Sequence, residues 1–298
     1  MKFLHKYLRA IGFSKFTSRK ELKELLSSVV VNASSRVYTT GTDNVLLGEF
    51  CRDFAENMGI AVCGEFDEED DDKFIYEYYY PYLRGTGITT SEDVSVERHA
   101  SQESYAGVCD DIKVGVSLIF YLQNMIPYVK AQAQGILPIK GTTLTLSALS
   151  LKGSIMMPIK KDEYQIKKIQ KESTNRTNLI AAARRGDEDA IETLTLEDMD
   201  MYTTISKKIQ KEDVFSLVDT YCMPYGVECD QYSILAEIQE CKTVKNNITG
   251  EEVYQMTLYC NELSFDMCIN KADLYGEPQK GRRFKGVIWL HGFINYPE

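Results

Sequence analysis

The chain has 298 residues, of which 44% are hydrophobic and 26% are charged, a composition typical of folded globular proteins rather than disordered or fibrous ones. Its formal net charge of -10 argues against a general nucleic-acid-binding protein, which would need a basic domain, so any anion site must be local. The longest nearly apolar stretch, residues 114–122, is far shorter than the roughly 20 residues that cross a bilayer, so we expect a soluble protein without a transmembrane segment.

The start of the chain and its cysteines both predict a cytoplasmic protein. Lys2, Lys6 and Arg9 are mixed among apolar residues, so the continuous apolar core of a signal peptide is missing. The eight cysteines are too few for a disulfide scaffold, and we expect them to be reduced thiols.

Two short helices are predicted at the N-terminus. The first ends at Gly12, which stands where a C-terminal cap would lie. The second, residues 19–32, follows Ser18, and Glu21 lies three residues on, which is the spacing of a capping box. Each helix has one apolar face: Phe3, Leu4, Tyr7, Leu8 and Ile11 in the first, and Leu22, Leu25, Leu26 and Val29 in the second.

An antiparallel sheet with helices beside it is predicted from residue 40 to residue 158. Residues 40–58 fit either a helix or a strand, and we favour a strand. The acidic run 65–73 lacks the central glycine and terminal glutamate of a calcium loop, so we interpret it as the solvated tip of a hairpin. The other expected elements are strands at 60–66, 74–83, 94–98, 112–122 and 142–157, and a short helix at 127–134.

A row of aromatic residues marks the second strand of this hairpin. At a period of two, all of its members fall on one side of the strand. Such a row can line a ligand cleft, although a half-buried sheet face beneath a helix is the commoner explanation. The row consists of Phe74, Tyr76, Tyr78, Tyr80 and Tyr82.

The rest of the chain predicts a helical connector and a small barrel. In the connector, a helix ends at Gly186, Asp187 caps the next helix, and a further helix is expected at Met199, Tyr202, Ile205 and Ile209. Four alternating strands with tight turns then predict a small β-barrel-like domain, because an open sheet of that size would expose its edges. The predicted fold is α+β, with an N-terminal antiparallel sheet and helices at 1–158, the connector at 159–220 and the barrel-like domain at 221–298.

The clearest binding signal is a basic segment in the last predicted strand. Phe284, Gly286, Ile288 and Leu290 form a core stripe, and the opposite face combines cations with aromatic rings. We predict that these residues, here called the basic ribbon, bind an anionic small molecule or an acidic protein surface. A solvated barrel edge, or a salt-bridged contact within the chain, is the alternative. The basic ribbon comprises Lys280, Arg282, Arg283, Lys285, Trp289 and His291.

No other motif indicates a reaction, a metal or a cofactor. Catalysis by cysteine and histidine would need one of the histidines near a reactive thiolate, but Cys109 is followed by two aspartates that would raise its pKa. Without a Cys-x-x-Cys pair, zinc binding is not expected. Gly85 and Gly87 lack the following lysine of a phosphate-binding loop and indicate a turn. The histidines are His5, His99 and His291.

Four segments resemble a family of bacterial proteins that share a domain of unknown function. They are FLHKYLRAIGFSKF, YYYPYLRG, MPYGVECDQYSIL and GEPQKGRRFKGVIWLHG, and the resemblance spans residues 3–294. The resemblance implies a bacterial, cytoplasmic protein and assigns no activity and no catalytic residue.

The sequence therefore favours a non-catalytic binding or regulatory protein in which the basic ribbon contacts its ligand or partner. Two alternatives from other classes stay open. One is a hydrolase or transferase with a site at the domain junction, and the other is a structural or assembly protein.

Overall fold

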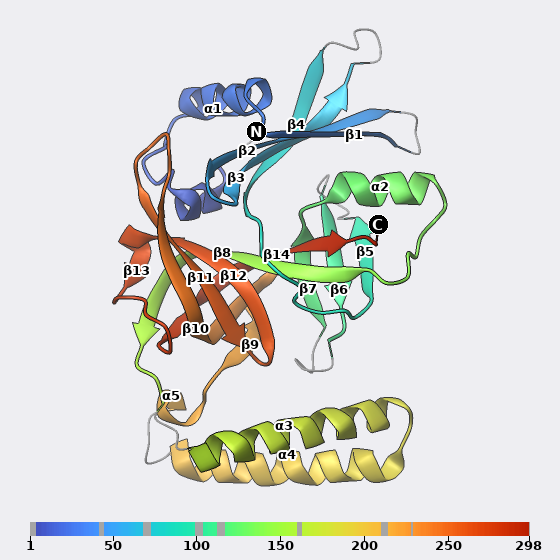
Figure 1. The fold of residues 1–298 in the computed structure, drawn as a ribbon, viewed down its shortest axis with the longest axis vertical. Coiled ribbons are helices and arrows are strands. Elements are labelled where there is room, and N and C mark those ends of the chain that lie inside the picture. Colours follow the sequence, from blue (N-terminus) through green and yellow to red (C-terminus); the bar gives the residue numbers. More distant parts are fainter. Residues whose placement is uncertain are drawn as a thin grey trace.

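The computed structural model describes residues 4–41, 45–67, 73–98, 104–111, 117–159, 163–209, 214–227 and 229–297. Figure 1 shows a four-stranded sheet at one end, a curved ten-stranded sheet in the middle and a pair of helices at the other end. The α+β fold, with an N-terminal antiparallel sheet and a C-terminal barrel, is confirmed. No helix in the described ranges is long and apolar enough to cross a membrane. Phe3, His99, residues 68–72 of the acidic run and residues 112–116 lie outside the described residues.

The N-terminal sheet is antiparallel, with its strands in chain order. The strands are β1 (Ser35–Thr40), β2 (Leu46–Ala55), β3 (Met58–Phe66) and β4 (Phe74–Leu83). The ambiguous residues 46–55 thus form a strand. The predicted hairpin is confirmed by pairs along β3 and β4, such as Phe66 opposite Phe74.

A β-bulge divides the aromatic row of β4. Cys63 of β3 pairs with Tyr78, but the next residue of β3 pairs with Tyr76, so Glu77 is an extra residue in β4. The extra residue shifts the alternation of the side chains by one position, so the even-numbered residues before and after the bulge lie on opposite faces of the sheet. The prediction that the aromatic residues form one row was therefore wrong. Phe74 and Tyr76 lie on one face, whereas Tyr78, Tyr80 and Tyr82 lie on the face toward the barrel.

Two short helices flank this sheet, as predicted. The first is a 3-10 helix, η1 (Lys6–Ile11), and Gly12 ends it with a φ of 86°, a conformation that favours glycine. The second, α1 (Arg19–Val31), begins with the predicted capping box between Ser18 and Glu21. Figure 1 shows α1 over the face of the sheet that points away from the barrel, while η1 lies near the barrel. Tyr7 of η1 stacks on Trp289, with ring centres 4.9 Å apart.

The second sheet combines strands from both halves of the chain. Its strands are β5 (Val94–Arg98), β6 (Tyr105–Cys109), β7 (Leu118–Leu122), β8 (Thr143–Met156), β9 (Tyr221–Pro224), β10 (Gln231–Lys245), β11 (Glu252–Cys260), β12 (Leu263–Asn270), β13 (Leu274–Tyr275) and β14 (Arg283–Asn295). They are hydrogen-bonded in the order β13-β8-β12-β11-β10-β14-β7-β6-β5, with β9 beside β10. A further pairing of β8 with β14 closes the ring β8-β12-β11-β10-β14, which is the barrel. The sequence had not predicted β6.

The barrel takes one strand from far upstream. β8 runs parallel to β12 and antiparallel to β14, so it completes a barrel whose other strands follow residue 230. The interior is apolar, and Phe284, Ile288 and Leu290 of β14 all point into it, as the core stripe predicted. The expected boundaries at residues 158 and 221 thus separate strands of one sheet, and the division into three domains stays a prediction. Two short helices complete these elements, α2 (Met125–Ala133) and η2 (Lys271–Asp273).

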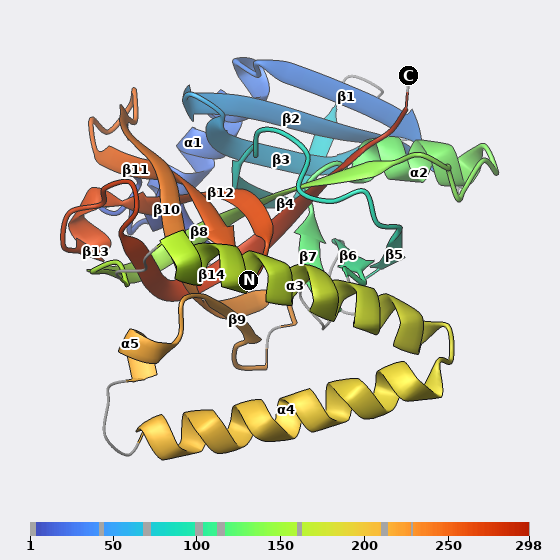
Figure 2. The ribbon, with the colours of Figure 1, turned by 60° about the horizontal axis from the view of Figure 1, so that its bottom comes forward.

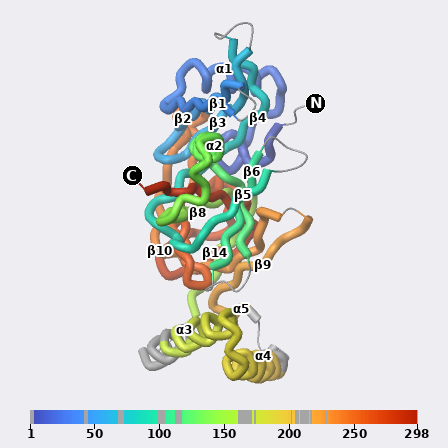
Figure 3. The backbone as a smooth tube through the Cα atoms, turned by 90° about the vertical axis from the view of Figure 1, so that its right-hand side faces the viewer, coloured from blue at the N-terminus to red at the C-terminus, as the bar shows by residue number. Residues whose placement is uncertain are grey.

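Two long antiparallel helices, here called the helical arm, form one end of the molecule (Figures 1, 2 and 3). They are α3 (Glu163–Arg184) and α4 (Glu188–Ile209), and the short helix α5 (Val214–Leu217) leads back to the barrel. The turn is the predicted one, because Gly186 has a φ of 88° and Asp187 Oδ1 accepts a hydrogen bond from Ala190 N at 3.1 Å. A further helix after α4 was wrongly predicted, since Met199 and Tyr202 belong to α4 itself.

Candidate functional site

The basic ribbon does not form one continuous surface. Lys280 is exposed, and Arg282 donates a hydrogen bond from Nη1 to the Glu277 carbonyl at 2.8 Å. Trp289 and His291 are only 6% and 0% exposed, because η1 and β4 cover that face of β14. An exposed face of cations and rings was therefore wrongly expected, since both faces of β14 are buried there. Ligand binding at the remaining cations stays a prediction.

Arg283 joins the helical arm to the barrel. Its Nε donates to the Met157 carbonyl at 3.0 Å, just before the arm. Nη1 and Nη2 donate to the carbonyls of Val218 and Phe215, just after it, at 2.8 and 2.9 Å. Lys285 lies over the Phe215 ring, with Nζ 3.8 Å from its centre. Two cations of the basic ribbon thus hold both ends of the arm in place.

His291 is enclosed between the barrel and the N-terminal sheet. Its Nδ1 lies 2.9 Å from Gln123 Nε2, so Nδ1 accepts the amide hydrogen and Nε2 carries the ring proton. Nε2 has no hydrogen-bond partner within the described residues, but the imidazole meets the Trp289 ring edge to face at 4.0 Å. Burial lowers the pKa of His291 to about 3, so the ring is neutral at physiological pH.

A buried carboxyl group, Glu49, lies on the face of the N-terminal sheet that points toward the barrel. It accepts hydrogen bonds from Tyr80 Oη at 3.2 Å and from the thiols of Cys51 and Cys63 at 3.6 and 3.5 Å. Burial raises the pKa of Glu49 and of both thiols, which favours their neutral forms. This cluster is therefore a closed polar network rather than a reactive thiolate site. Across the described ranges, no group of three or more His, Cys, Asp or Glu side chains is arranged to hold a metal ion.

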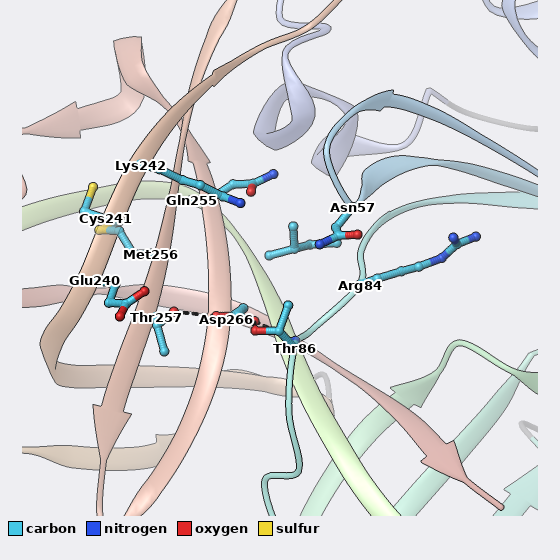
Figure 4. Close-up of a pocket in the computed structure, with 11 residues that line it drawn as sticks. Asn57, Arg84, Thr86, Glu240, Cys241, Lys242, Gln255, Met256, Thr257 and Asp266 are labelled. Carbon is cyan, nitrogen blue, oxygen red and sulfur yellow. Dashed lines mark hydrogen bonds between the residues drawn. The ribbon is translucent and has the colours of Figure 1, made fainter. Parts of the chain in front are cut away.

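A pocket of about 160 Å³ opens between the end of β4 and the outer face of the barrel (Figure 4). One side comes from the β2–β3 turn and the chain after β4, and the other side comes from β10, β11 and β12. The lining residues are Asn57, Leu83, Arg84, Thr86, Glu240, Cys241, Lys242, Gln255, Met256, Thr257 and Asp266.

Three lining residues lie directly opposite one another on neighbouring strands. Glu240 of β10 pairs with Thr257 of β11, which pairs with Asp266 of β12. Strict alternation after Ile238, which points into the barrel, would turn Glu240 inward as well. A β-bulge at Gln239 shifts the register and directs Glu240 to the outer face.

The carboxylate of Asp266 is held in a fixed orientation. Its Oδ1 accepts a hydrogen bond from Thr257 Oγ1 at 2.7 Å. Its Oδ2 accepts two bonds from Thr86, from the backbone N and from Oγ1, both at 2.7 Å. Figure 4 shows Glu240, Thr257, Asp266 and Thr86 following one another along one side of the pocket. One lone pair of Asp266 Oδ1 is left to accept a further hydrogen bond.

The two cations of the pocket are directed elsewhere. Lys242 forms an ion pair with Glu56, with Nζ and Oε2 2.8 Å apart. Arg84 packs over the Tyr82 ring, 4.9 Å from its centre, and its side chain runs away from Glu240 and Asp266 (Figure 4). The Glu240 carboxylate has no ion-pair partner among the residues that the structure describes. The pocket thus presents negative charge on the side formed by β10 and β12.

Cys241 is the one thiol that lines this pocket. Burial raises its pKa to about 11, so it is protonated at physiological pH and is a poor nucleophile. Sequence analysis missed the pocket, because its acidic residues come from separate strands and reach one face only through the bulge at Gln239. Neither the bulge nor the strand order leaves a motif in the sequence.

The family model described as a domain of unknown function from E. rectale (DUF3881) matches residues 8–292. The chain belongs to this family. The DUF3881 match includes residues 8–11 of η1, both sheets except for the last three residues of β14, and the helical arm, so it covers the pocket and the whole basic ribbon. The predicted resemblance to a family without assigned function is confirmed. Searches of curated proteins and of solved structures find no match.

Proposed function

We propose that this DUF3881 protein is a non-catalytic binding protein that holds a small polar amine in the pocket between β4 and the barrel. The observation that carries the proposal is the alignment of Glu240 with Asp266 on one side of the pocket. An ammonium group beside two carboxylates forms charge-assisted hydrogen bonds, which are roughly twice as strong as neutral ones. The net charge of -10 also attracts a cationic ligand over long distances.

The side chains of the pocket support binding better than catalysis. The hydroxyl groups of Thr86 and Thr257 are engaged in orienting Asp266, and the Cys241 thiol is protonated. A hydrolase or transferase would need a nucleophile or a paired acid and base at this junction. A carboxylate that is already oriented before the ligand arrives loses little conformational freedom on binding, which favours affinity.

The basic ribbon supports an anionic ligand less well. Arg283 and Lys285 are engaged at the ends of the helical arm, and Arg282 bonds to a carbonyl. Lys280 and Arg282 are the cations that stay accessible to an acidic partner. Changing both to glutamate provides a control that should leave amine binding unaltered.

We also place the protein in a reducing compartment such as the cytoplasm. All eight cysteines are free thiols, and most of them are buried as small apolar side chains. Free thiols persist where glutathione and thioredoxin keep them reduced.

A pair of ligands that differ in charge tests the amine site. Putrescine, a diamine, should bind in calorimetry and raise the thermal midpoint, whereas 1,4-butanediol, its uncharged analogue, should do neither. At a putrescine concentration of 100 times Kd, the free energy of unfolding should rise by about 2.7 kcal/mol. Equal binding of the diol, or no binding of the amine, would refute the proposal.

The substitution Glu240→Gln localises the effect. It removes one charge without changing the shape of the side chain, so putrescine affinity should fall about tenfold, which corresponds to about 1.4 kcal/mol. Glu237→Gln is the matched control, because Glu237 lies on the same strand and does not line the pocket. Unchanged affinity in Glu240→Gln would place the amine elsewhere.

A further inference from the structure

The helical arm has an exposed apolar face on α4. Ile191, Leu196, Met199 and Tyr202 are 48%, 57%, 63% and 76% exposed. Residues 8 and 11 positions apart lie close together around an α-helix, so positions 191, 199 and 202 share one side of α4, with position 196 at its border. These are large apolar side chains concentrated in one helix.

The neighbouring side of α4 is already occupied by α3. Ala190 is only 5% exposed, and Asp198 binds Arg176 of α3 at 2.7 Å. The exposed apolar face is therefore additional to the contact within the arm. A stripe of apolar residues on an amphipathic helix normally packs against another element, and helices gain most of their stability from such packing. Among the described residues, no third layer covers this face, which is therefore open to water.

The charges of the two helices indicate what covers that face. α3 carries five basic and two acidic side chains, for a formal charge of +3. α4 carries two basic and six acidic side chains, for a formal charge of -4. The arm is therefore complementary to a second arm in which each α3 lies beside the α4 of the other copy. An acidic or a basic partner alone would match only one of the two helices.

We propose that the arm packs against the arm of a second copy of this chain, which forms an antiparallel four-helix bundle. A two-fold axis brings the same face of both copies together, and α3 of each copy neighbours α4 of the other. Each α4 then buries the side that holds Met199 and Tyr202 in the centre of the bundle. The arm and the pocket lie in different parts of the molecule (Figures 1 and 4), so this inference does not depend on amine binding.

Sedimentation velocity and light scattering of the full chain, over a range of concentrations, test the proposal. The wild type should have twice the 34.0 kDa mass of one chain. Met199→Glu with Tyr202→Glu places two charges in the bundle centre and should raise the dimer dissociation constant by at least about 100-fold, as central contacts often do. Thr193→Glu is the matched control, because Thr193 is exposed on another side of α4, and it should leave the dimer intact.

Far-UV circular dichroism should show that all three proteins keep their helix content, since each substitution is at an exposed position. A wild type that stays at the mass of one chain at every concentration overturns the proposal and leaves another protein as the occupant of the face. A dimer that survives Met199→Glu with Tyr202→Glu overturns it as well, because the contact then lies elsewhere. Dissociation of the Thr193→Glu control to the same extent as the double variant also overturns the proposal.

Discussion

At the scale of single residues, burial decides the charge of the histidines at the junction of the two sheets. The pKa of His291 is lowered to about 3 and that of His5 to about 4, in both cases mainly by burial. An unfolded chain binds a proton at each of these rings near pH 6.5. The unfolded state therefore gains protons first as the pH falls, and acid favours unfolding.

We predict that His291 makes the protein sensitive to mild acid. Between pH 6.5 and the folded-state pKa of about 3, its contribution to the free energy of unfolding falls by about 1.4 kcal/mol per pH unit. Urea unfolding from pH 7 to pH 4 should show a shallower dependence in His291→Gln than in the wild type. Glu49 has the opposite effect on the pH dependence, because its raised pKa favours the folded state in acid. Since Glu49 is present in both proteins, it does not account for a difference between them.

The control for this experiment is Leu290→Met, the preceding residue of β14. Its side chain points into the barrel and does not titrate, so stability should change while the pH dependence stays that of the wild type. Parallel pH profiles for His291→Gln and the wild type would contradict the prediction.

At the scale of elements, one arginine controls the attachment of the helical arm. Removing the Arg283 guanidinium removes its hydrogen bonds to the carbonyls of Met157, Phe215 and Val218, and hydrogen bonds to a charged group contribute about 1.5–3 kcal/mol each. In Arg283→Met, amide hydrogen exchange should therefore rise by about tenfold or more at both ends of the arm. The strands β11 and β12 should keep their protection.

Arg282→Met is the companion variant for that measurement. Arg282 bonds to the Glu277 carbonyl and has no bond to the arm within the described residues, so exchange near the arm should match the wild type. Equal protection of the arm ends in both variants would show that Arg283 does not hold them.

Local signals predicted the helices and strands, but β-bulges determined on which face of a sheet some of the side chains lie. The capping box at Ser18, the turn at Gly186 and the alternation of β14 all depend on neighbouring residues, and each was predictable. The bulges at Glu77 and Gln239 depend on pairing with another strand, so they divided the aromatic row and created the acidic side of the pocket without a sequence signal. The alternation along β14 likewise predicted which residues lie on each of its two faces. Whether a face is exposed to solvent, however, depends on η1 and β4.

At the scale of the whole molecule, β8 and β14 connect parts of the chain that the sequence assigned to different domains. β14 pairs with β7, β8 and β10, and its outer face packs beneath η1 and the N-terminal sheet. Long-range parallel pairing, such as that of β8 with β12, has no local sequence signal, which is why the expected boundaries cut across one sheet. The small barrel itself was predictable from its alternating strands.

This connectivity predicts one cooperative unfolding transition for the sheets. Trp289 is the one tryptophan of the chain, and it lies where η1 meets the barrel, so its fluorescence reports on the junction. In urea, the midpoint from fluorescence should coincide with the midpoint from β-sheet circular dichroism. Separate midpoints would instead support independent domains at 1–158 and 221–298.

The place of the helical arm in the chain also has a consequence for synthesis on the ribosome. β8 is made before the arm, but both of its barrel partners, β12 and β14, are made after it. At roughly 5–20 residues per second, β8 waits on the order of 10 s for β14, and the arm lengthens that delay. During that delay both edges of β8 lack their partner strands, and unpaired strand edges make incompletely folded chains prone to aggregation.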